Sequence, residues 1–170
     1  MIGAKPLKEG IKKQIEDIRW QRKLSEFEKI KATRRQYAEE LSMVHDALNS
    51  SVSGVIITNL EGKIIYVNNT FLRIFDCQSK SEVLGKNAAH FFVEESVKKF
   101  ADVKAKIDRA EGEVEEFAVQ RKDGTVFPVE VSSSNVSDSS GNIVGRMASF
   151  FDISKRKRAE EEKKRDSRHV

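Results

Sequence analysis

The sequence has 170 residues, of which 38% are hydrophobic and 34% are charged, with a net charge of +4. This balance indicates a soluble chain with one domain of ordinary size and charged extensions, and it excludes a chain that is globular throughout. No stretch approaches the roughly 20 apolar residues of a membrane span, no signal peptide is visible, and the single cysteine excludes an internal disulfide, so we expect a cytoplasmic protein.

The first element predicted is one long helix from residue 6 to about 48. No proline or glycine lies between Ile11 and Asn49, and the composition favours helix. A helix of this length cannot bury its apolar residues on a small domain, so they need a partner chain. The apolar residues recur at the spacing of a coiled-coil seam, and this heptad register shifts near residue 19. We therefore expect a parallel homodimer of modest strength. The interface residues are Trp20, Leu24, Phe27, Leu41 and Leu48.

Residues 54–86 predict a hairpin followed by a short helix. The β-branched run at 55–57 favours a strand, the corner at 59–62 contains a glycine suited to a tight turn, and a second β-branched run follows at 64–67. Asn68 or Asn69 then caps a helix that begins near Thr70.

The rest of the domain is predicted as one long helix and three strands. A short turn at 87–92 leads to a helix over 94–109, and strands follow at 113–120, 125–134 and 143–152. Glycine-containing turns separate the strands, which is typical of antiparallel hairpins.

Two motifs in this order resemble a PAS sensor domain, of the kind found in bacterial sensor histidine kinases. The first comprises Gly62, Ile64, Asn68, Phe71 and Leu84-Gly85-Lys86, and the second is the closing Asp152-Ile153-Ser154, where serine replaces the usual threonine. The resemblance covers residues 42 to 154. It implies an α+β fold, a PAS-like five-stranded antiparallel sheet with helices on one face, between a long N-terminal coiled-coil-type helix and a short C-terminal helix.

Charge divides the chain into three segments. Residues 1–45 form a dimerisation and signalling helix of net charge +4, residues 46–153 form the PAS domain, and residues 154–170 start a second signalling helix that we expect to be truncated. Residues 46–152 carry a net charge of −4 and residues 153–170 a net charge of +4. Acidic residues interrupt both basic arms, so solvated helix faces are favoured over a nucleic-acid contact.

The sequence contains no recognisable catalytic or metal-binding motif. A metal site needs three or four ligands, and His90 lies far from Cys77 in the sequence. Haem ligation by His90 is the less favoured alternative, because haem-binding PAS relatives use a histidine on the long helix. The flavin-reactive cysteine motif of light-sensing relatives is absent. We therefore expect no enzyme activity, no metal, no coloured cofactor, and a Cys77 that packs in the interior.

The resemblance implies an aromatic-rich pocket between the sheet and the helices. An interior packed without space for a ligand is at least as well supported by the sequence. If the inward-facing residues of a strand are assigned one position off, the opposite set of residues lines the pocket. The expected wall residues are Phe71, Phe75, Phe91, Val97, Phe100, Phe117, Val119, Val129, Val131 and Phe151.

We therefore interpret the chain as a regulatory module that detects a small ligand or relays a conformational change. The signal would pass through flanking helices to an effector domain in the same full-length protein. Asp152 and Ile153 are the expected relay, as cap and anchor of the following helix. A ligand-free dimerisation module is the main alternative, and a nucleic-acid contact through the basic arms is a weaker one.

Overall fold

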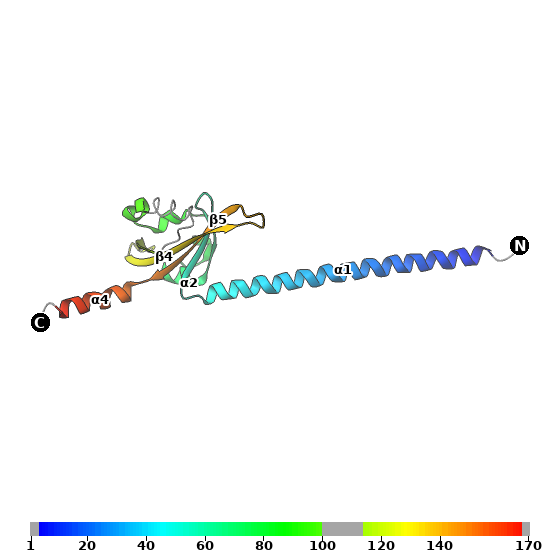
Figure 1. Ribbon diagram of the computed structural model, residues 1–170, viewed down its shortest axis with the longest axis horizontal. Coiled ribbons are helices and arrows are strands. Elements are labelled where there is room, and N and C mark those ends of the chain that lie inside the picture. The colour runs from blue at the N-terminus through cyan, green and yellow to red at the C-terminus, as the bar shows by residue number, and fades with distance from the viewer. Residues whose placement is uncertain (1–3, 100–113, 168–170) are drawn as a thin grey trace. The chain divides into compact units, whose positions relative to one another are not determined.

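The computed structural model describes residues 4–99 and 114–167, with side chains from residue 9 onward. The chain divides into two units, residues 1–46 and 47–170. The second unit contains a five-stranded antiparallel sheet with short helices, and a single long helix runs through the first (Figure 1). The expected fold class is confirmed.

The long helix α1 spans Ala4–Ser50, close to the predicted range of 6 to 48. Its described side chains are exposed from residue 9 to residue 47. Many of them are large and apolar, including Ile18 at 58% exposure and Leu41 at 71%. None of the described helices combines the length and apolar character needed to cross a bilayer.

The strands lie in the order β2-β1-β5-β4-β3, and each neighbouring pair is antiparallel. Figure 1 shows β4 and β5 running side by side. The strands are β1 (Gly54–Asn59), β2 (Ile64–Val67), β3 (Glu115–Gln120), β4 (Val126–Ser137) and β5 (Ile143–Asp152).

Short helical elements connect β2 to β3, and a longer helix follows β5. They are α2 (Asn69–Ile74), the 3-10 helices η1 (Lys80–Glu82) and η2 (Ala88–Phe91), helical residues 94–99, and α4 (Ser154–Asp166). Of the helix predicted over 94–109, the part from residue 100 onward lies outside the described residues.

The turn between β1 and β2 forms as its glycine predicts. Gly62 has φ +82°, a left-handed conformation that a side chain would strain. The Asn59 side chain accepts hydrogen bonds from the Glu61 and Lys63 N–H groups, at 3.0 and 2.9 Å. This Asx-type closure joins the two strands in a tight corner.

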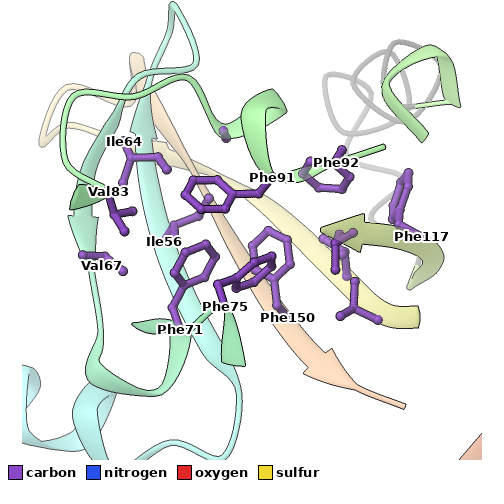
Figure 2. Close-up of a cluster of buried hydrophobic side chains, with 14 of the residues drawn as sticks. Ile56, Ile64, Val67, Phe71, Phe75, Val83, Phe91, Phe92, Phe117 and Phe150 are labelled. Atoms are coloured by element: carbon purple, nitrogen blue, oxygen red, sulfur yellow. The ribbon is translucent and has the colours of Figure 1, made fainter. Parts of the chain in front are cut away.

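A cluster of phenylalanines lies between the sheet and α2. The rings of Phe71 and Phe75 stack at 4.2 Å, and the ring of Phe150 from β5 lies edge-on to both, at 5.3 and 5.6 Å. Figure 2 shows these three rings at the centre of the cluster, with Phe91 above them. Burying so much aromatic surface is the main stabilising contribution of this core.

Candidate functional site

Beside the phenylalanine cluster lies a cavity of about 330 Å³. Its volume falls within the range typical of small-molecule pockets. Most of its lining is apolar, with polar groups at particular positions. The lining residues are Ile56, Thr58, Leu60, Glu61, Gly62, Asn87, Ala88, Ala89, Phe92, Val97, Val131, Arg146, Ala148 and Phe150.

One wall of the cavity is a face of the sheet. The antiparallel register pairs Ile56 with Ala148, and Thr58 with Arg146, across β1 and β5. Paired residues on neighbouring strands project from the same face, as do residues two apart along a strand. Phe150 therefore lies on the same face as Ala148 and Arg146, and these residues line one continuous surface.

The facing wall comes from the segment that follows η1. The Asn87 side chain accepts a hydrogen bond from the Ala89 N–H at 2.9 Å and donates one to the Glu61 carbonyl at 3.3 Å. These bonds cap η2 and join it to the β1–β2 corner. The packing of Phe92 on Phe117, with ring centroids 5.3 Å apart, extends this wall towards β3.

Gly145 allows β5 to approach β1 closely next to Arg146. A Cβ atom at this position would collide with the backbone carbonyl oxygen of Thr58. The neighbouring strand backbone cannot yield as a flexible side chain would. Glycine here therefore maintains the strand spacing at the polar end of the cavity.

The structure places the ten predicted wall residues in different surroundings. Val97 and Val131 line the cavity, and Phe100 lies outside the described residues. Phe151 is 46% exposed, and its neighbour Phe150 lies on the cavity side. The remaining six are buried in the adjoining core: Phe71, Phe75, Phe91, Phe117, Val119 and Val129. Whether any of the ten contacts a ligand stays a prediction.

Sequence reasoning missed most residues of the cavity wall. The alternation of side chains along β5 could have identified them, because Arg146, Ala148 and Phe150 are two residues apart and project from the same face of the strand. Both faces of this strand carry large apolar residues, so hydrophobicity alone does not show which face points into the cavity.

His90 and Cys77 line a separate hollow, together with the Phe91 and Arg121 side chains. The imidazole of His90 lies edge-on to Phe91, with ring centroids 5.8 Å apart. Cys77 packs against the core, and burial raises the pKa of its thiol, with a further contribution from Glu82. The protonated thiol is a poor nucleophile.

Within residues 4–99 and 114–167, no three His, Cys, Asp or Glu side chains gather in a group able to hold a metal ion.

Asp152 and Ile153 join β5 to α4. The Asp152 carboxylate accepts a hydrogen bond from the Ser154 N–H at 2.9 Å, and lies 3.4 Å from the Arg121 guanidinium. Ile153 is 1% exposed. The N-cap position of α4 is Ile153, whose side chain makes no capping bond, and Asp152 holds the first N–H of the helix from one position earlier. Ile153 anchors the start of the helix by its burial.

Ion pairs tie the first turn of α4 to the edge of the sheet. The Arg156 guanidinium lies 2.7 Å from the Glu130 carboxylate and 2.9 Å from the Glu116 carboxylate, which also contacts Lys157 at 2.6 Å. The hydrogen bond from Lys157, together with the charge of Arg156, lowers the pKa of Glu116. We name Glu116, Glu130, Arg156 and Lys157 the α4 ion cluster.

The predicted dimer residues differ in exposure. Trp20, Leu24 and Phe27 are 67%, 48% and 63% exposed. Leu48 is half-buried, and its carbonyl accepts a hydrogen bond from the Asn68 side-chain amide at 2.6 Å. Leu48 therefore has contacts within the domain.

Comparison with known proteins gives the family of this fold. A family model described as PAS domain matches residues 52–155. No protein with a curated description matches the sequence.

Solved structures share the fold at low sequence identity. The PAS domain of a protein from Colwellia psychrerythraea superposes with a TM-score of 0.63 at 20% identity, covering 68% of this chain and 98% of that one. A PAS domain from a two-component sensor histidine kinase gives 0.54 at 18% identity, covering 68% and 96%. An RNA-binding light-oxygen-voltage receptor gives 0.63 at 17% identity, covering 74% of this chain but only 36% of the receptor.

Proposed function

Because the chain belongs to the PAS domain family, we propose that it is a non-catalytic sensory module that detects a small molecule in the cavity. The signal would pass through the flanking helices to an output domain of the same full-length cytoplasmic protein. One observation carries this proposal. Phe150 lines the cavity, and Asp152, two residues later on β5, accepts a hydrogen bond from the N–H of Ser154, the first residue of α4. A displacement of β5 by a ligand therefore acts directly on the start of the helix.

The proposed active form is a parallel homodimer joined by α1. Its support is the exposed apolar side chains of this helix, which include Trp20, Leu24 and Phe27. A seam of this kind is stable only when a second helix covers it. In such a dimer, a change at α4 would alter how two output domains face each other.

A ligand-free dimerisation module is the second candidate. The observation that favours it is the close packing of Phe71, Phe75 and Phe150, which fills much of the interior without a ligand.

The test fuses residues 1–165 in heptad register to a kinase catalytic core. Ala148→Leu fills part of the cavity, and Ser134→Leu adds an apolar side chain on the opposite face of the sheet as the matched control. We expect Ala148→Leu to shift autophosphorylation several-fold and Ser134→Leu to leave it unchanged. Equal activity of both variants and the parent, in folded dimers, would favour the ligand-free module.

A further inference from the structure

We propose that the cavity binds an apolar carboxylic acid, whose carboxylate contacts Arg146 and Thr58 and whose tail lies towards Phe150 and Phe92. The inference rests on the proposed function for the presence of a ligand in this cavity, and it adds the chemical class of that ligand.

Polarity changes stepwise along the sheet face of the cavity. Arg146 on β5 is paired with Thr58 on β1 and with Asn135 on β4, so three polar residues form a row across three strands. Two residues further along β5, Ala148 is paired with Ile56. Rows on one face are about 7 Å apart.

The next row along the same face is apolar. Phe150 is paired with Val131, and both line the cavity. Phe92, from the facing wall, lies with its ring centroid 5.9 Å from that of Phe150. A ligand that spans these rows needs a polar group at one end and an apolar body at the other.

Arg146 determines the charge that the polar end accepts. It is the cationic side chain among the described lining residues. A guanidinium stays charged at physiological pH, and its planar fork matches the two oxygens of a carboxylate.

The Thr58 hydroxyl supplies a second donor. Thr58 is 7% exposed and lines the cavity beside Arg146, its partner across β1 and β5. A hydroxyl at the cavity wall can donate a hydrogen bond to an oxygen atom of a ligand.

Two further polar residues, Glu61 and Asn87, line the cavity. The Glu61 carboxylate lies 3.3 Å from the Lys63 ammonium group. The Asn87 side chain bonds to Ala89 and to the Glu61 carbonyl. A carboxylate repels an acidic group and a neutral amide binds it less strongly than a guanidinium does, so Arg146 is the strongest partner for an acid among these residues.

The test measures binding to the full chain by titration calorimetry. The probes are octanoate and 3-phenylpropanoate, which distinguish an aliphatic from an aromatic tail, with 1-octanol as the neutral analogue. We expect at least one of the two acids to bind about tenfold more tightly than the alcohol, as a charged hydrogen-bonded pair would produce. Acids that bind no better than the alcohol, or do not bind at millimolar concentration, would overturn the proposal.

Variants locate the acidic group. Arg146→Met should weaken binding of the acid at least about tenfold while changing that of 1-octanol less than about threefold, with the exposed Arg34→Met as control. Thr58→Val should weaken binding of the acid several-fold, and it tests the site even if Arg146→Met does not fold. Unchanged affinity for the acid in either folded variant would overturn the assignment. These titrations measure binding directly and test only the chemical class of the ligand. The kinase fusion tests the proposed sensory function independently, so a negative titration does not decide its result.

Discussion

Asn68 shows how one side chain organises the entry to the domain. Its side-chain oxygen accepts hydrogen bonds from the Val55 and Phe71 N–H groups, at 2.8 and 2.9 Å. Its amide donates to the Leu48 and Ser53 carbonyls, at 2.6 and 3.0 Å. Asn68 is 0% exposed, and its bonds to Val55 and Phe71 are buried while those to Leu48 and Ser53 are partly buried. A single residue thus joins the end of α1, the start of β1 and the N-terminus of α2.

Replacing Asn68 by Ala should lower the free energy of unfolding by about 3 kcal/mol or more, since several buried backbone groups would lose their partners. Urea denaturation monitored by circular dichroism measures the loss. Asn69→Ala is the matched control, because that side chain is exposed, and we expect a change below about 1 kcal/mol. Similar losses in the two variants would contradict the role assigned to Asn68.

At the scale of elements, α4 depends on a cap and on charge. Its sequence is strongly polar, and none of its residues is buried. A helix of this length and composition is marginal by itself. Contacts at its first turn therefore decide whether it continues rigidly from the sheet.

Asp152→Ala should loosen the first turn of α4 while leaving the core intact, because the carboxylate both accepts a hydrogen bond from the Ser154 N–H and pairs with Arg121. Loss of a cap costs about 0.5–2 kcal/mol of helix stability. Amide exchange of residues 154–158 measures the effect, and the kinase fusion shows whether it reaches the output. A folded variant with unchanged exchange and unchanged kinase activity would place the relay elsewhere.

The α4 ion cluster predicts a dependence on pH. The pKa of Glu116 is lowered below its ordinary value of 4.5, chiefly by Lys157. A carboxyl group of this kind stabilises the contact above its ordinary pKa, and the stabilisation disappears as the pH falls through the lowered value. Carbon chemical shifts of residues 154–158 should therefore lose helical character on acidification below about pH 4.5.

Glu116→Gln should weaken the contacts between α4 and the sheet already at neutral pH. The change in the carbon chemical shifts of residues 154–158 on acidification should then be smaller than in the parent chain. Glu162→Gln, an exposed change on α4 itself, is the control. An acid transition of full size in Glu116→Gln would assign the pH dependence to other groups.

The positions of the helices, strands and turns could be predicted from the sequence more accurately than the buried faces of the strands. The turns at Gly62, Gly124 and Gly141 carry a clear signal, and all three glycines have positive φ. The sequence carries no such signal for which face of β5 is buried. Phe150 and Phe151 are adjacent and equally apolar, yet Phe150 is 1% exposed and Phe151 is 46% exposed. Neighbouring strands decide between them, and that information is not local.

The left-handed residue Asp76, with φ +55°, was also beyond the sequence pattern. Aspartate tolerates this conformation without requiring it. Here it follows the C-cap of α2, where the Cys77 N–H donates to the Leu72 carbonyl at 2.9 Å and the Asp76 N–H to the Arg73 carbonyl at 3.4 Å. The polar half of the cavity was missed for a similar reason. Arg146 and Thr58 are 88 positions apart in the sequence, and only the strand register brings them together.

For the whole molecule, assembly is the property to test. Deleting residues 1–40 removes Trp20, Leu24 and Phe27 but retains Leu48 with its bond to Asn68. We expect the shortened chain to be folded and largely monomeric, and the full chain to be dimeric, because the removed apolar side chains are exposed in the single chain and a second helix would cover them. Sedimentation velocity measures both masses. A shortened chain that dimerises as strongly as the full one would place the interface on the domain.

The outer strands of the sheet have one further consequence, for solubility. At β3, the Ala118 carbonyl accepts a hydrogen bond from the Val93 N–H at 3.3 Å, and the Ala118 N–H donates to the Ser96 hydroxyl at 3.2 Å.

At the opposite edge, Ile64 of β2 exchanges backbone hydrogen bonds with Gly85 and Lys86, at 2.8 and 2.9 Å. Residues 85–96 therefore occupy backbone groups on both outer strands, which would otherwise invite a strand from another molecule. A mutation that detached this connecting segment would leave the sheet paired internally and open to fibrillar growth at either side.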